Sequence, residues 1–112
     1  MSEVKGYMEV VRKLSLEEKV QLLTGRDMWF VNGSETAGLN PMLLSDGPSG
    51  VRGERWDARD ASLNLPSSAV LASTWSADAA TQYGKALASE AKRKGANVVL
   101  GPTINLHRSP YG

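Results

Sequence analysis

The chain has 112 residues, of which 41% are apolar and 22% charged, and its formal net charge is +1. This balance is typical of a globular domain and argues against a disordered chain. The near-zero charge and a sequence pI near 8.0 argue against a nucleic-acid-binding surface. Cysteine is absent, which excludes disulfides, thiol nucleophiles and cysteine-ligated metals, and one histidine is too few for a protein-built zinc site. A magnesium or calcium site built from oxygen ligands is not excluded by this count. Our prediction is that the chain has no metal and no cofactor.

No apolar stretch approaches the roughly 20 residues that a membrane-spanning helix needs, so a membrane partner is not expected. The first residues lack the apolar core of a secretory signal, which favours a cytoplasmic location. The sequence carries no indication of the oligomeric state.

Two helices are predicted at the start of the chain. Residues 4–14 place apolar side chains at helical spacing, with charged residues between them. Ser15 and Glu18 have the spacing of a capping box, which opens a second short helix with Gly25 as its C′ residue. Residues 25–41 are rich in Gly, Asn, Ser and Thr, so we expect a loop there.

The middle of the chain predicts a strand followed by a polar surface segment. Residues 42–44 form a short apolar run that ends in the turn-rich segment 45–50. An apolar strand that ends in a Gly/Pro loop is typical of a central parallel strand. Residues 53–65 are then expected to lie on the surface.

A long helix and a second apolar strand, residues 97–101, complete the pattern. Ser76 can cap the helix, and Gly95 suits its C′ position. Its expected buried stripe consists of Ala80, Tyr83, Leu87 and Ala91. Strand, helical crossover and strand make a βαβ unit, hence an α/β fold with a parallel sheet. Two strands that are apolar on both faces cannot cover themselves, so the residues are typical of the opening of a larger α/β domain.

The loops after the two strands hold the candidate functional residues, because α/β folds bind ligands outside the carboxyl ends of their strands. Asp46 directly follows the first strand, where a carboxylate can accept hydrogen bonds from two sugar hydroxyls, and Arg52 supplies donors from the same loop. The structural alternative is an Asp46 that only caps its turn and an Arg52 that only lies on the surface. After the second strand, Asn105, His107 and Arg108 could add polar contacts or only orient their loop.

The three tryptophans are candidates for stacking on a sugar ring. Trp29 and Trp56 lie in predicted loops and remain open as candidates, whereas Trp75 directly precedes a helix and is expected in the core. The basic run Lys92–Lys94 is expected to be a solvated helix end that suits the helix dipole, in preference to a nucleic-acid patch.

Four ordered segments, which together span residues 14–112, resemble the N-terminal part of the family 3 glycoside hydrolases, the β-glucosidase group. The most specific is the run from Ser45 to Arg52, which reads S-D-G-P-x-G-[VL]-R. The four segments are Leu16–Gly25, Leu44–Arg52, Leu65–Ser67 with Ala72–Trp75, and Lys94–Pro102 running on to Arg108–Pro110.

The resemblance implies that residues 1–112 are the first βα units of a TIM-like (β/α)8 barrel, incomplete here, with an α/β sandwich domain following the barrel. It implies retaining hydrolysis of terminal non-reducing β-glycosidic bonds, on small-molecule or oligosaccharide β-glycosides. Asp46 matches the family aspartate that hydrogen-bonds the terminal sugar, Arg52 matches an arginine beside that subsite, and Arg108 matches an arginine of a later motif. The family's nucleophile and acid/base residue correspond to positions beyond Gly112.

The distribution of acidic residues agrees with the absence of both catalytic carboxyl groups from these 112 residues. A retaining glycosidase needs two carboxyl groups roughly 5–5.5 Å apart, and only Asp46 is predicted at the end of a strand. A typical barrel takes about 250 residues, so we expect the 112 residues to be inactive alone. Two alternatives remain open, namely a non-catalytic carbohydrate-binding module and a fragment that binds a protein partner.

Overall fold

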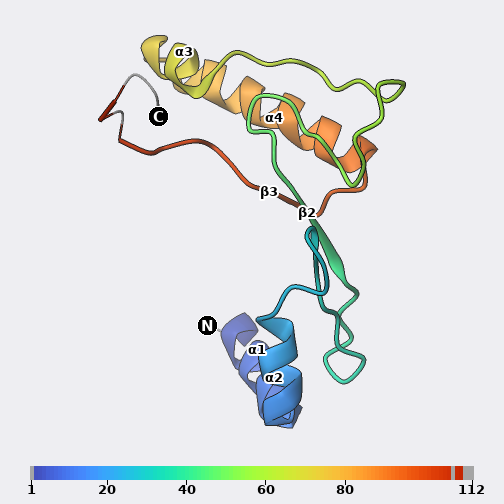
Figure 1. Ribbon diagram of the computed structural model, residues 1–112. Coiled ribbons are helices and arrows are strands. Elements are labelled where there is room, and N and C mark those ends of the chain that lie inside the picture. Colours follow the sequence, from blue (N-terminus) through green and yellow to red (C-terminus); the bar gives the residue numbers. More distant parts are fainter. Residues whose placement is uncertain (1, 107, 110–112) are drawn as a thin grey trace. The chain divides into compact units, whose positions relative to one another are not determined.

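A computed structural model describes residues 2–106, 108 and 109 (Figure 1). The chain divides into two compact units, Met1–Leu44 and Ser45–Gly112, which are described separately below. The strand order of the sheet is β1-β2-β3. No helix in the described part of the chain is long and apolar enough to cross a membrane.

The first unit opens with two helices, α1 (Ser2–Lys13) and α2 (Leu16–Leu22). The predicted capping box is confirmed, since the Ser15 hydroxyl accepts a hydrogen bond from the amide of Glu18 and the Glu18 carboxylate accepts one from the amide of Ser15. These bonds satisfy amide groups that a helix start leaves without partners. The predicted end is wrong, because α2 ends with Leu23 as its C-cap and Gly25 instead pairs with Val31 in an isolated bridge.

A short antiparallel hairpin completes the first unit. Strand β1 (Phe30–Val31) pairs with β2 (Met42–Ser45), and Phe30 lies opposite Leu43. Asp27 stabilises the turn before β1, because its Oδ1 accepts hydrogen bonds from the amides of Trp29 and Phe30 at 2.9 Å. The sequence predicted only a loop here, since a two-residue strand is too short to show an alternating pattern.

The second unit contains the last residue of β2, helix α3 (Ser68–Ser73), helix α4 (Ala77–Arg93) and strand β3 (Val98–Val99). The Ser76 side chain caps α4, as predicted, and Gly95 follows the C-cap with a φ of +71°. The amide of Leu100 donates to the carbonyl of Ser45 at 2.8 Å, which joins the chain after β3 to the end of β2. Helix α3 was not predicted, and β3 is shorter than the expected strand over residues 97–101.

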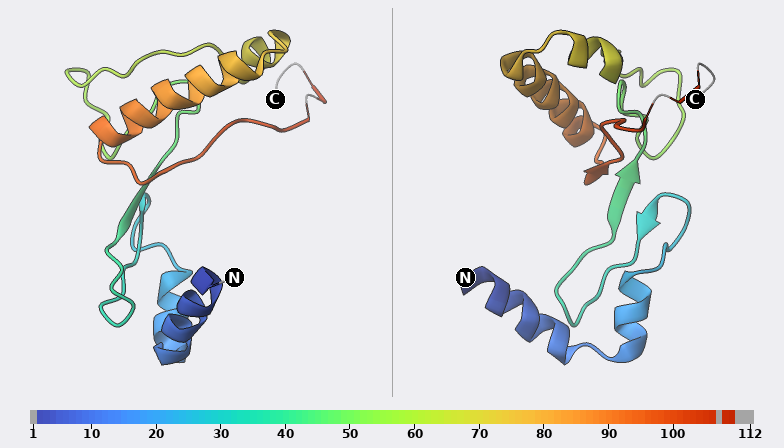
Figure 2. Two further views of the ribbon diagram at one scale, coloured as in Figure 1. Left: turned by 180° about the vertical axis from the view of Figure 1, so that it is seen from behind. Right: turned by 90° about the vertical axis from the view of Figure 1, so that its left-hand side faces the viewer.

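Figures 1 and 2 show the segment between β2 and α3 running beside α4. Tyr83 of α4 holds this segment, since its hydroxyl lies 2.7 Å from the carbonyl of Pro48 and 3.0 Å from that of Pro66. The expected surface segment, residues 53–65, therefore lies between two residues that Tyr83 attaches to the helix.

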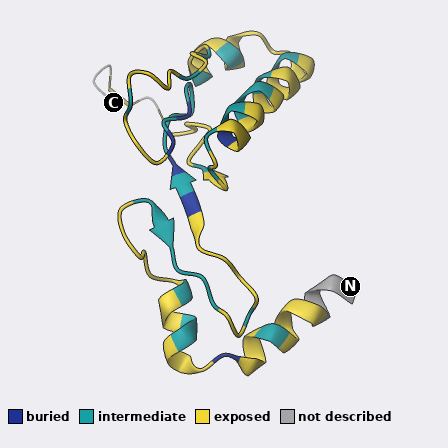
Figure 3. Cartoon of the chain, turned by 90° about the vertical axis from the view of Figure 1, so that its right-hand side faces the viewer, coloured by how far each residue is buried: buried dark blue, intermediate teal, exposed yellow. Residues whose placement is uncertain are grey.

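Few apolar side chains are buried in the part of the chain that the structure describes (Figure 3). The buried ones are Leu14, Leu43, Val51 and Ala91. Of the expected stripe on α4, Ala80 is exposed and Tyr83 is half-buried. Trp75, expected in the core, is 95% exposed with a φ of +50°, because the chain turns sharply there between two helices. In the second unit, several large apolar side chains therefore remain exposed, among them those of Val70, Trp75, Val98 and Leu100.

Candidate functional site

The turn after β2 is built around glycine. Gly47 has a φ of +92°, which favours glycine, and a Cβ atom there would lie 1.9 Å from the carbonyl oxygen of Gly50. The amide of Gly50 donates to the carbonyl of Gly47 at 3.0 Å, closing the turn. The turn directs the chain back so that Asp46 and Arg52 meet.

Asp46 and Arg52 form an ion pair at this turn. The Arg52 Nε donates to the Asp46 Oδ1 at 2.7 Å, and the Arg52 amide donates to the Asp46 carbonyl at 3.3 Å. The Asp46 side chain is 49% exposed and that of Arg52 is 26% exposed. A carboxylate has about four acceptor positions, so contact with one Nε leaves the group able to accept hydroxyl groups of a ligand.

Ser45 bonds through its side chain to the backbone on both sides of the Asp46–Arg52 loop. Its side chain is fully buried, donates to the carbonyl of Asp46 at 2.9 Å and accepts from the amide of Gly53 at 2.8 Å. One hydroxyl thus ties the start of the loop to its end, and it satisfies a buried amide that would otherwise be costly.

The pair lines a surface pocket of about 390 Å³. Trp56, which is 87% exposed, lines the same pocket. The pocket therefore combines a carboxylate, a guanidinium and an aromatic ring. The lining residues are Asp46, Gly47, Gly50, Arg52, Arg55, Trp56, Asp57, Ala58, Asp60, Ala61 and Ser62.

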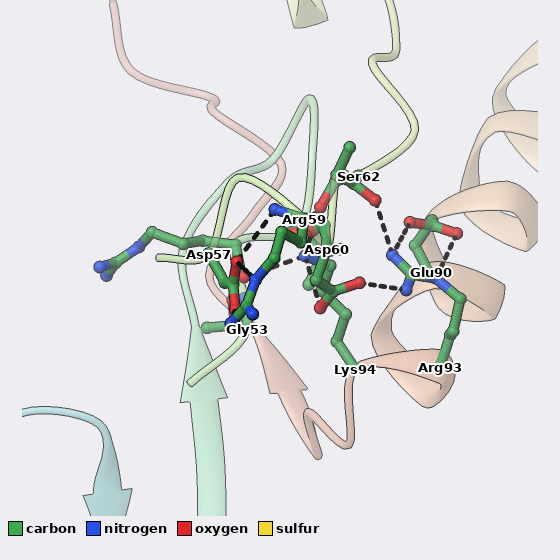
Figure 4. A network of polar contacts seen from close by, with 12 residues as sticks. Gly53, Asp57, Arg59, Asp60, Ser62, Glu90, Arg93 and Lys94 are labelled. Carbon is green, nitrogen blue, oxygen red and sulfur yellow. Dashed lines mark hydrogen bonds and ion pairs between the residues drawn. The ribbon is translucent and has the colours of Figure 1, made fainter. Parts of the chain in front are cut away.

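Ion pairs attach Asp60, which lines the pocket, to the end of α4 (Figure 4). Arg93 contacts Glu90 through two hydrogen bonds, Nε to Oε1 at 3.2 Å and Nη2 to Oε2 at 3.0 Å, and its Nη1 donates to Asp60. The hydrogen bond from Arg93, aided by one from Lys94, holds the pKa of Asp60 below its ordinary value. The pKa of Glu90 is also lowered, first by Arg93 and then by the amide of Leu63.

Two more acidic residues of the pocket, Asp57 and Asp60, were not predicted as neighbours of Asp46. Asp57 pairs with Arg59, whose side-chain hydrogen bonds and amide lower the pKa of Asp57. A general acid needs a raised pKa, so neither residue is suited to protonate a leaving group. The alternating charges of residues 52–60 were the signal in the sequence that this segment is held by ion pairs.

The other predicted site residues do not join this pocket. Asn105 lines a separate pocket of about 540 Å³ with parts of α3, and Arg108 is exposed with its amide bonded to the carbonyl of Leu106. Trp29 belongs to the first unit, and His107 lies outside the described residues. No group of three His, Cys, Asp or Glu side chains that could hold a metal occurs among the described residues.

Comparisons with known proteins identify a family for this arrangement. No protein-family model matches the chain. β-Glucosidase B of Emericella nidulans is 44% identical over 103 residues, which are 92% of this chain and 12% of that protein. The crystal structure of β-glucosidase from Kluyveromyces marxianus in complex with glucose matches 92% of this chain and 12% of its own, with 35% identity and a TM-score of 0.81.

A third relative carries the family name. The crystal structure of the GH3 β-glucosidase of Bifidobacterium adolescentis is 35% identical, with a TM-score of 0.73 over 91% of this chain and 14% of that one. The chain thus spans about 12% of the length of the curated relatives it matches. By sequence and by fold, the chain resembles the N-terminal region of the family 3 β-glucosidases.

Proposed function

We propose that this chain supplies the terminal-sugar subsite of a β-glucosidase that hydrolyses terminal non-reducing β-glycosidic bonds with retention. The observation that carries the proposal is the Asp46–Arg52 ion pair, which lines a pocket at the end of β2. Support comes from the similarity to β-glucosidases, one of which has a structure in complex with glucose.

The geometry of the pair is suited to bind a sugar. A carboxylate accepts hydrogen bonds from two neighbouring hydroxyls of a pyranose ring, and charge-assisted bonds of this kind are about twice as strong as neutral ones. The bond from Arg52 to Oδ1 limits rotation of the Asp46 carboxylate, so less entropy is lost when a sugar binds.

The proposal places residues 1–112 in the first βα units of a TIM-like barrel whose other segments supply the nucleophile and the acid/base carboxylate. The remaining barrel and an α/β sandwich domain would then belong to the rest of the enzyme. The lowered pKa values of Asp57 and Asp60 support this division, because neither of these two carboxyl groups is suited to general acid catalysis.

The test uses the protein expressed from its complete reading frame, with 4-nitrophenyl β-D-glucopyranoside as substrate. Asp46→Asn keeps the shape of the side chain and removes its charge, so two charge-assisted hydrogen bonds weaken and kcat/KM should fall by about 100-fold. Glu54→Gln is the matched control, since Glu54 lies in the same segment and does not line the pocket.

Equal activities of the Asp46→Asn and Glu54→Gln variants would remove Asp46 from the site. A wild-type protein that binds glucose without hydrolysing any β-glycoside would favour the carbohydrate-binding alternative. A protein that does neither contradicts the proposal.

A further inference from the structure

Lys94 has a side chain that is more deeply buried than is usual for a lysine. It is the C-cap of α4, and its side chain is only 4% exposed, whereas lysine ammonium groups nearly always reach water. Its Nζ lies 2.6 Å from the carbonyl of Asp60, 3.2 Å from the Asp60 Oδ2 and 3.3 Å from the carbonyl of Arg52. An ammonium group has three N–H donors, and these three acceptors match them.

The stem of Lys94 packs against the end of the Asp46–Arg52 loop. Gly53 is buried with a φ of +80°, and a Cβ atom there would lie 3.1 Å from the Cδ of Lys94 and 3.3 Å from its Cβ. On its other side, the amide of Gly53 donates to the hydroxyl of Ser45. The backbone at 52–53 is therefore held between the Ser45 hydroxyl and the whole length of one lysine side chain.

We propose that Lys94 is a positioning residue for the sugar subsite, which it serves by fixing the backbone of Arg52 so that the guanidinium meets Asp46. The proposal rests on the proposed function, because it assigns to Lys94 the geometry of that subsite. Lys94 acts through its contacts with the Arg52 carbonyl and with Asp60, which lines the same pocket as Asp46 and Arg52.

Arg93 does not replace Lys94 in this role. Its side chain is 45% exposed and binds Glu90 on α4, as well as Asp60 and the carbonyl of Ala61 in the segment between β2 and α3. The Lys94 ammonium group reaches the carbonyl of Arg52 itself. Figure 4 shows the side chains of Arg93 and Lys94 at the end of α4. Lys92, two residues earlier on the same helix, is exposed and has the same charge, so it provides a matched control.

The experiment compares Lys94→Met, Lys94→Arg and Lys92→Met in the protein expressed from its complete reading frame. Hydrogen–deuterium exchange of the peptide covering residues 45–54 reports the amides of Arg52 and Gly53, which bond within the loop. Glucose inhibition and the KM for 4-nitrophenyl β-D-glucopyranoside report the subsite.

We expect Lys94→Met to speed exchange of this peptide and to raise the glucose inhibition constant and KM about tenfold, with kcat changed less than about threefold. The kcat is spared because the proposed catalytic carboxylates lie on other segments. Lys94→Arg should recover part of the loss, and Lys92→Met should match the wild type in every measurement.

The possible failures are distinguishable. If Lys94→Met equals Lys92→Met in exchange and in KM while the wild type hydrolyses the glucoside, the role of Lys94 is refuted and the proposed function stands. If the wild type neither binds glucose nor hydrolyses the glucoside, the proposed function fails, and with it the assignment of Lys94 to a sugar subsite. Should Lys94→Met not fold, Asp60→Ala removes the side-chain acceptor of the Lys94 ammonium group, and unchanged exchange of residues 45–54 in that variant also refutes the role.

Discussion

Replacing Gly47 with alanine tests the turn that brings Asp46 and Arg52 together. The φ of +92° would cost an alanine about 1–2 kcal/mol. The new Cβ would also lie 1.9 Å from the carbonyl oxygen of Gly50, so the turn must open and its 3.0 Å hydrogen bond is lost, at a cost of about 1 kcal/mol. Together these effects disfavour the present loop by about 2–3 kcal/mol, and the affinity for glucose should fall by about 30-fold or more.

The assay is the glucose inhibition constant of the protein expressed from its complete reading frame. Gly38→Ala is the control, because Gly38 also has a positive φ, of +64°, and an added Cβ there would meet nothing within 4 Å. That variant should lose some stability through its positive φ and should retain the glucose affinity of the wild type. Wild-type glucose affinity in Gly47→Ala would refute the reasoning, since the loop would then tolerate a side chain where the geometry leaves no space.

Three further predictions concern stability and activity. Ser45→Ala leaves the buried amide of Gly53 without its acceptor. In the protein expressed from its complete reading frame, denaturant unfolding should show a free energy of unfolding that is lower by about 1–3 kcal/mol. An unchanged value would mean that another group satisfies this amide. The contacts of Asp60 with Arg93 and Lys94, and those of Glu90 with Arg93 and the amide of Leu63, should be at full strength above the ordinary pKa values of 3.8 and 4.5. They should weaken as the pH falls through the lowered pKa values of the folded protein. Exchange rates of residues 53–65 at pH 7, 5 and 3 check this, and a loss of protection already between pH 7 and 5 would contradict it. The 112 residues expressed alone should show no cooperative thermal transition, because few apolar side chains are buried among the described residues. They should not hydrolyse chromogenic β-glycosides, because a retaining glycosidase needs two suitably placed carboxyl groups. A sharp melt of a monomer, or clear turnover that is lost on Asp46→Ala, would be evidence against this.

Local chemistry accounts for what could be predicted about the helices and the loop. The caps at Ser15 and Ser76, and Gly95 after α4, depend on hydrogen bonds and φ values within a few residues of one another. Asp46 and Arg52 are six residues apart in one turn, so their meeting is also a local event. The β1–β2 hairpin was missed because Phe30 pairs with Leu43, which the local pattern does not contain. The end of α2 and the exposure of Trp75 were predicted wrongly, since Gly25 pairs with Val31 and the chain turns sharply at Trp75.

The sequence by itself therefore determined the α/β character of the chain, its resemblance to family 3 glycoside hydrolases and the two residues at the centre of the candidate site. Only the tertiary structure decided what surrounds that pair. Trp56 and Asp60 share its pocket, and Lys94, 42 residues after Arg52 in the chain, has its ammonium group buried against the Arg52 carbonyl. In the sequence, Lys94 is one of three basic residues at a helix end, all equally suited to the helix dipole. Which of them points inward is set by packing across the fold, because burial of a charge is stable only where several acceptors from distant segments converge on it.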